Sequence, residues 1–249
     1  MCAAPDREDA AAGGAGTLYV VATPIGNLGD ASTRCVEVLM AVDAIAAEDT
    51  RRTRKLLSHF GVSTRLVSYH DHNEDRVSRE ILERLESGES IALVSDAGTP
   101  LIADPGYRIV RSCAERGVDV VSVPGPSAAV AALSISGLPP HPFYFAGYLP
   151  RKGGQRKTRL GALGALGCTV IMYESPHRIA AMLRDAADVL GSRRAVVARE
   201  LTKVHEEVLR GTLEELAEAA STRRLKGEMV VVVEGGAATD EEPPDTGSD

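Results

Sequence analysis

Short runs of apolar, mostly β-branched residues alternate with amphipathic stretches, and this alternation constrains the fold more than any other feature of the chain. In the first half, strands are expected at 17–23, 43–48, 65–70, 90–95 and 118–123, with helices at 31–41, 50–60, 74–86 and 105–116. Continuous apolar strands separated by helices are typical of a parallel sheet that is covered on both faces. The first half therefore predicts an α/β domain over residues 17–126 with a mainly parallel sheet.

The pattern changes after Pro126. Helices are expected at 127–136, 153–166, 176–190 and 213–221, and strands at 169–174, 195–200, 206–212 and 228–235. Only five residues separate the segments 195–200 and 206–212, which is too few for a helical crossover, so these strands must pair antiparallel. We therefore expect a second α/β domain over residues 127–236 with a mixed sheet, and a domain boundary near 124–130.

The net charge of −7 belongs to the two ends of the chain. Residues 1–16 and 237–249 carry the acidic excess and are expected to be disordered tails, whereas the body between them is neutral. The acidic pI is therefore no argument against an anionic partner.

Several classes of protein are disfavoured. The first residues lack a basic segment followed by an apolar one, as a secretory signal would have. The uncharged run 120–150 is interrupted by six prolines, so it does not predict a membrane span. Four scattered cysteines without a CxxC pair indicate free thiols in a reducing cytoplasm and no zinc site. Aromatic residues make up only 4%, fewer than a base-stacking module usually has.

Three loops rich in glycine and proline follow predicted strands, at 22–30, 95–106 and 124–129. Each of them alone is read most simply as an ordinary turn. Ligands of open α/β sheets bind beyond the carboxyl ends of the strands. Three such loops at one sheet edge therefore predict a ligand site there.

Two basic clusters predict contacts with phosphates, although a solvated surface is the simpler reading of either one alone. The first holds four bases between 51 and 55, Arg51, Arg52, Arg54 and Lys55, and the second holds Arg151, Lys152, Arg156, Lys157 and Arg159. His70 and His72 could ligate a metal, but no third ligand is evident. We expect them to be polar loop residues near the substrate, and we expect no metal.

The motifs VATPIGNLGD, EDTR, SDAGTPLIADPG, VPGPSAAVAALSISGLP, YESPHRI and ARELTKVHEEVLRGTLEEL resemble the ribosomal RNA small subunit methyltransferase I family. These are the 16S rRNA (cytidine-2′-O)-methyltransferases, a branch of the tetrapyrrole methylase superfamily. The resemblance runs from residue 17 to 235. It implies two α/β domains with S-adenosylmethionine in the cleft between them, a homodimer, and the small ribosomal subunit as partner.

The resemblance also implies which residues contact the cofactor, largely through their backbone. In the first half they are Pro24, Gly26, Asp96, Ala97, Gly98, Thr99, Pro100, Pro124, Gly125, Pro126, Ser127 and Ala128. In the second half they are Met172, Tyr173, Glu200, Leu201, Gly227 and Glu228.

The catalytic group is the least constrained prediction. Glu200 and Lys203 follow a predicted strand next to the implied cofactor loop, so either could help remove the hydroxyl proton or stabilise the alkoxide. Asp49 is a third candidate catalytic residue, and with Arg51 it is expected to place the RNA. The alternatives are a surface ion pair for Glu200 and Lys203, and a helix-start carboxylate for Asp49.

Two other functions remain open. A tetrapyrrole C-methyltransferase would have the same fold and a small-molecule acceptor, but it would not need two separate basic segments. A non-catalytic RNA-binding module would not need intact cofactor loops.

Overall fold

The computed structural model describes residues 14–236, which form two compact units, one up to Ser127 and one from Ala128 on. The predicted tails at 1–13 and 237–249 lie outside the described residues. Gly16, which was assigned to the first tail, is buried, and its N–H donates to the Leu85 carbonyl, so the ordered chain begins earlier than predicted.

The first unit contains a five-stranded sheet in the order β3-β2-β4-β1-β5, and every pair of neighbours is parallel. Its elements are β1 (Leu18–Val21), the 3-10 helix η2 (Leu28–Asp30), α1 (Thr33–Ala41), β2 (Ala44–Ala47), α2 (Thr50–His59), β3 (Leu66–Ser68), α3 (Glu74–Glu86), β4 (Ile91–Val94), α4 (Tyr107–Arg116) and β5 (Val120–Val123). The predicted strands and helices are all present, and the sheet is parallel throughout.

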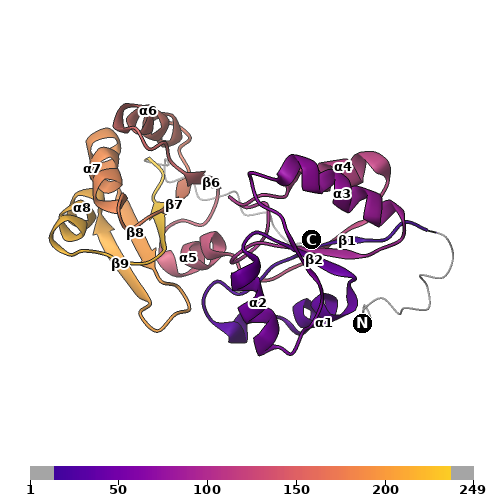
Figure 1. Cartoon of the computed structure of the whole chain (residues 1–249). Coiled ribbons are helices and arrows are strands. Elements are labelled where there is room, and N and C mark those ends of the chain that lie inside the picture. Colours follow the sequence, from indigo (N-terminus) through magenta and orange to yellow (C-terminus); the bar gives the residue numbers. More distant parts are fainter. Residues whose placement is uncertain (1–13, 237–249) are drawn as a thin grey trace, which may run out of the picture. The chain divides into compact units, whose positions relative to one another are not determined.

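Helices cover both faces of this sheet (Figure 1). On one face, α1 and α2 bury Val38, Leu39 and Leu57 against strand residues such as Ile45. On the other face, α3 and α4 bury their own apolar side chains, among them Ile109. Because both faces are covered, the strands read as unbroken apolar runs in the sequence.

The second unit contains a mixed sheet in the order β6-β7-β10-β8-β9. Its elements are α5 (Ala128–Ser136), β6 (Phe143–Tyr148), α6 (Gly153–Gly164), β7 (Thr169–Glu174), α7 (Ile179–Leu190), β8 (Arg194–Arg199), β9 (Glu207–Thr212), α8 (Leu213–Thr222) and β10 (Met229–Val233). β6 is parallel to β7, and the other pairs are antiparallel, including the predicted pair of β8 and β9.

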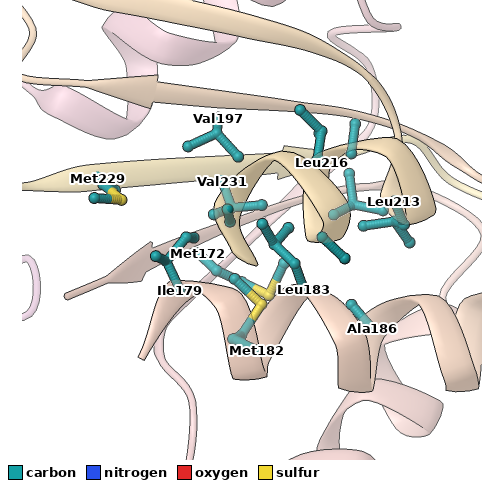
Figure 2. Packing of buried hydrophobic residues seen from close by; sticks show 14 of the residues in the cluster. Met172, Ile179, Met182, Leu183, Ala186, Val197, Leu213, Leu216, Met229 and Val231 are labelled. Carbon is teal, nitrogen blue, oxygen red and sulfur yellow. The ribbon is translucent and has the colours of Figure 1, made fainter. Parts of the chain in front are cut away.

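One core cluster packs α6, α7 and α8 against this sheet. Figure 2 shows Met182, Leu183 and Ala186 of α7 below the strands, with Leu213 and Leu216 of α8 beside Val231. Within residues 14–236, every helix is too short or too polar to cross a bilayer.

The strand β6 was not predicted. Its sequence FYFAGY has no clear alternation of apolar and polar residues, and it contains an irregularity of register between Phe145 and Gly147. Because β6 lies at the edge of the sheet, only β7 pairs with it.

Candidate functional site

The three glycine- and proline-rich loops of the first unit meet at the carboxyl edge of its sheet, as predicted. β1 lies between β4 and β5, so the segments that follow these strands are neighbours. Thr23 and Gly98 exchange two backbone hydrogen bonds of 2.9 and 3.0 Å. The Thr99 hydroxyl donates to the Pro126 carbonyl at 3.2 Å. The loops after β1, β4 and β5 therefore form one connected surface.

The backbone of these loops would allow a ligand to come close to the main chain, with few side chains in between. Gly98 has a φ of +83°, and a Cβ on Gly125 would lie 3.0 Å from the Ala22 Cβ. Leu101 and Ala103 also adopt left-handed φ values of 71° and 70°. Such conformations cost about 1–3 kcal/mol and concentrate at ligand sites. These features fit a cofactor that is held largely by backbone groups.

Asp49 caps the helix that follows β2. Its carboxylate accepts the Arg51 backbone N–H at 2.8 Å and forms an ion pair with the Arg51 side chain at 3.0 Å. Hydrogen bonds from the Arg51 side chain and backbone lower the pKa of Asp49 to about 2. A carboxylate of such low basicity is a poor proton acceptor at neutral pH. The prediction of a catalytic role for Asp49 is therefore not supported, and its helix-start alternative fits the structure.

Asp96 joins the loops after β2 and β4. Its carboxylate accepts the Asp49 backbone N–H at 2.9 Å and forms an ion pair with Arg52 at 3.1 Å. Arg52, predicted to contact RNA, is thus tied to the implied cofactor loop. Arg51 is exposed beside Asp49, and Arg54 is exposed on α2.

A pocket of about 200 Å³ opens at this edge of the first unit. Its wall combines the hydroxyl residues Thr23 and Ser95 with Asp96 from the strand ends, and α2 contributes Arg52 and Lys55. Pro24 and Gly26, both implied cofactor residues, also line it. Lys55 belongs to the first basic cluster of the sequence, and the structure adds that it lies on the pocket side of α2.

Asp104 is a further carboxyl that sequence reasoning did not single out. Burial raises its pKa to about 6, and the nearby charge of Glu48 adds to this effect. Burial also raises the pKa of Glu48, together with the charge of Asp96. Strongly perturbed carboxyls next to a candidate site are a functional signal, although they also occur in purely structural networks.

In the second unit, Glu200, Lys203, Gly227 and Glu228 form one cluster. Lys203 Nζ lies 3.0 Å from both Glu200 Oε1 and Glu228 Oε2, and Glu200 Oε1 also accepts the Glu228 N–H at 3.0 Å. Glu200 and Thr202 have left-handed φ values of 50° and 66°. A Cβ on Gly227 would collide with the Glu200 carboxyl group. The structure therefore joins the loop after β8 to the residues before β10.

The pKa shifts of Lys203 and Glu200 indicate whether Lys203 can accept a proton or acts as a positive charge. Burial alone would lower its pKa, but the hydrogen bonds and charges of Glu228 and Glu200 raise the pKa above its usual value. Burial would raise the pKa of Glu200, but the Lys203 and Glu228 hydrogen bonds lower it. Lys203 is thus held as an ammonium and Glu200 as a carboxylate. The idea that Lys203 accepts a proton is not supported, whereas stabilisation of an alkoxide by its positive charge remains a prediction.

The other implied cofactor residues of the second unit lie in the core or at its margin. Met172 and Leu201 are buried. Tyr173 packs edge-on against Phe145 and Tyr148, with ring centroids 5.0 and 5.7 Å apart. Two implied cofactor residues lie at the start of α5: Ser127 precedes the helix, and Ala128 is its first residue.

The members of the second basic cluster differ in their exposure, so they do not form one continuous basic surface. Arg151 and Lys152 are exposed. Arg156 is buried and pairs with Asp185 at 2.5 Å, so its prediction as an RNA contact is wrong. Its guanidinium contacts the Asp185 carboxylate and the Arg151 carbonyl inside the second unit.

The rest of this cluster is partly engaged as well. Lys157 pairs with Asp188 at 2.7 Å, and Arg159 stacks on the Tyr144 ring. Both remain at the surface and keep their predicted role open.

His70 and His72 lie in the loop between β3 and α3, as expected for polar loop residues, with ring centroids 5.9 Å apart. Among residues 14–236 no three His, Cys, Asp or Glu side chains gather in a way that could hold a metal ion.

The family model of tetrapyrrole (corrin/porphyrin) methylases matches residues 17–217, so this chain with its parallel first sheet and mixed second sheet is a tetrapyrrole methylase. A solved structure of diphthine synthase covers 88% of this chain and 90% of its own, with a TM-score of 0.69 and 19% identity. Uroporphyrin-III C-methyltransferase from Thermus thermophilus, solved with S-adenosylhomocysteine, gives a TM-score of 0.64 at 17% identity and covers 88% and 97%.

Within that class, the sequence relatives are more specific. The ribosomal RNA small subunit methyltransferase I of Xylella fastidiosa is 54% identical over 228 residues, 90% of this chain and 84% of the relative. The protein of the same name from Bacillus subtilis is 49% identical over 220 residues, 88% and 75% respectively. The chain belongs to the ribosomal RNA small subunit methyltransferase I family.

Proposed function

We propose that this chain transfers a methyl group from S-adenosylmethionine to the ribose 2′-hydroxyl of a cytidine in 16S rRNA. The proposal is supported by relatives that are about half identical over most of the chain and named as small-subunit rRNA methyltransferases. The observation that carries it is the connected loop surface formed by Thr23, Gly98 and Pro126. Its acceptor is the small ribosomal subunit, and it acts in the cytoplasm as a homodimer.

Both units are proposed to contribute residues that hold the cofactor. In the first unit, the backbone of residues 96–100 and 124–128 would bind it, with Pro24 and Gly26 beside them. In the second unit, the segments at Met172–Tyr173, Glu200–Leu201 and Gly227–Glu228 would do so. S-adenosylmethionine supplies an electrophilic methyl group on its sulfonium.

The protein's own contribution is to orient the acceptor and to manage its proton. Positioning two reactants can account for much of the rate enhancement of a displacement. The Lys203 ammonium, held by Glu200 and Glu228, is proposed to stabilise the alkoxide as the hydroxyl proton leaves for solvent. In this scheme Glu200 is a positioning residue that holds Lys203.

The exposed cations are proposed to hold the RNA backbone. Arg51, Arg54, Arg151 and Lys152 are all at the surface. Arg52 is proposed to contact the RNA as well, while its ion pair with Asp96 connects it to the implied cofactor loop. These contacts are sequence-independent, so they predict a strong dependence of binding on salt.

The test is an acceptor comparison. Purified protein is incubated with methyl-labelled S-adenosylmethionine and, separately, with small ribosomal subunits, protein-free 16S rRNA and uroporphyrinogen III. We expect label in the RNA of one or both ribosomal acceptors. Label in the tetrapyrrole alone would instead support the small-molecule C-methyltransferase, the activity named for a fold neighbour.

The cofactor site is tested by calorimetry on protein treated with EDTA. We expect S-adenosylmethionine to bind without added metal. Binding that appears only after a divalent ion is added would overturn the metal-free assignment.

A further inference from the structure

The pocket in the first unit is lined by apolar, hydroxyl and positively charged side chains, and this mixture indicates what kind of ligand it can bind. Leu28 and Leu56 form an apolar part of the wall, whereas Thr23 and Ser95 form a polar part at the strand ends. Two cations, Arg52 and Lys55, stand one turn apart on α2. A ligand with a flat or ring-shaped body and a negative group would meet both kinds of wall.

Two cations, Arg52 and Lys55, and one carboxylate, Asp96, line this pocket. Arg52 is paired with Asp96 at 3.1 Å, which neutralises one cation. Lys55 is exposed, and it forms no ion pair or hydrogen bond with any residue in the part of the chain that the structure describes. Lys55 therefore offers an unpaired positive charge to an anionic group of a ligand, on the α2 side of the pocket and apart from the pair of Arg52 and Asp96.

The size of the pocket restricts the ligand further. Sites that enclose a drug-sized molecule usually measure about 300–1,000 Å³. A pocket of about 200 Å³ is smaller, so it accommodates one part of a larger ligand, such as a single sugar or base.

We propose that this pocket binds one nucleotide of the RNA substrate, with its sugar or base against Leu28 and Leu56 and a backbone phosphate at Lys55. The inference rests on the proposed function and deepens it by assigning a substrate subsite. Lys55 is then a positioning residue: it holds the RNA next to the cofactor loops and takes no part in the chemical step.

The first experiment replaces Lys55 by glutamine and by arginine. The control is Arg79→Gln, the loss of one exposed positive charge on α3, away from the pocket. For each protein, filter binding measures affinity for the small subunit at several salt concentrations. Calorimetry measures affinity for S-adenosylmethionine, and single-turnover methylation gives the half-saturating subunit concentration and the limiting rate.

We expect Lys55→Gln to weaken subunit binding about tenfold, the loss typical of one charge-assisted contact. The slope of log affinity against log salt should fall by about 0.7–0.9, as expected for one phosphate. The half-saturating concentration should rise by the same factor, while the limiting rate and cofactor affinity change by less than about twofold. Lys55→Arg should restore most of the binding, and Arg79→Gln should match the parent.

A second variant, Leu28→Trp, tests the pocket without changing its charge. Leu28 is partly exposed, so the larger ring is tolerated by the fold, which a thermal melt verifies. We expect it to raise the half-saturating subunit concentration at least about tenfold and to leave cofactor affinity unchanged, because it fills space that the nucleotide needs.

The outcomes separate this inference from the proposed function. If the parent binds and methylates the subunit but Lys55→Gln binds it equally well with the same salt slope, the nucleotide subsite is wrong. If Lys55→Gln and Leu28→Trp instead weaken S-adenosylmethionine, the pocket belongs to the cofactor. If the parent neither binds nor methylates the subunit, the proposed function fails and the subsite with it.

Discussion

Replacing Arg156 by alanine should destabilise the second unit without removing an RNA contact. The Arg156 side chain is 8% exposed, and that of Asp185 is 15% exposed. The guanidinium donates to Asp185 Oδ2 through Nε at 2.7 Å, and to the Arg151 carbonyl at 3.2 Å. Truncation therefore leaves a mostly buried carboxylate without its main partner.

The magnitude follows from what remains at Asp185. Removing one partner of a buried ion pair typically costs about 3–5 kcal/mol. Lys157 stays 3.5 Å from the other oxygen of Asp185 and is half-exposed, so it compensates only in part. We therefore expect a loss near the lower end, about 3 kcal/mol. For a chain of this size, that lowers the melting temperature by roughly 6–12 °C.

The assay is a thermal melt of Arg156→Ala beside Arg151→Ala, the exposed neighbour in the same segment. Arg151→Ala should keep the melting temperature but weaken subunit binding. The double variant Arg156→Met, Asp185→Leu should recover most of the lost stability, since it removes both charges together. If Arg156→Ala melts like the parent and binds subunits poorly, the assignment of Arg156 to the interior is refuted.

Three further substitutions test other parts of the structure. Gly98→Val should weaken S-adenosylmethionine at least about tenfold in calorimetry and lower the melting temperature by roughly 2–12 °C, because the left-handed φ costs about 1–3 kcal/mol. Arg178→Ala should destabilise by about 3 kcal/mol in urea, since it leaves the Glu174 carboxylate, 1% exposed, without its cation. Asp104→Asn should stabilise the protein above pH 6, by clearly less than the roughly 3 kcal/mol that the full pKa shift corresponds to, because this carboxyl is partly exposed and solvent screens its charge.

The sign of the Asp104 effect follows from its pKa. The pKa of this carboxyl rises from 3.8 to about 6 on folding, so the folded protein takes up the proton first. Its charge therefore opposes folding above pH 6, and protonation relieves this as the pH falls toward 4. The difference in stability between variant and parent should shrink over that range. A difference that stays constant from pH 4 to 8 would contradict the assigned pKa.

The order of elements was predictable because each element carries its own local signal. The apolar runs of the first unit mark strands buried on both faces, and the five-residue link between β8 and β9 leaves no room for a crossover. β6 escaped prediction because its aromatic and glycine residues have no strand period, and it is recognised only through its pairing with β7.

The site was predictable only where loops follow strands. Gly98 and Pro126 could be placed at one edge because parallel strands end together. The partner of Arg156 is 29 residues away on another helix, and Lys203 meets Glu228 across 25 residues. No local pattern encodes such pairs, so a basic run cannot be divided into buried and exposed members from sequence alone.

The most direct test of the central claim is to locate the transferred methyl group. Small subunits lacking the modification are incubated with the purified protein and deuterium-methylated S-adenosylmethionine, and the RNA is digested to nucleosides for mass spectrometry. We predict one labelled nucleoside, a cytidine whose label stays on the ribose after the glycosidic bond is broken. Label on a base, on another nucleoside, or absent from the RNA while S-adenosylmethionine is bound would contradict the proposed reaction.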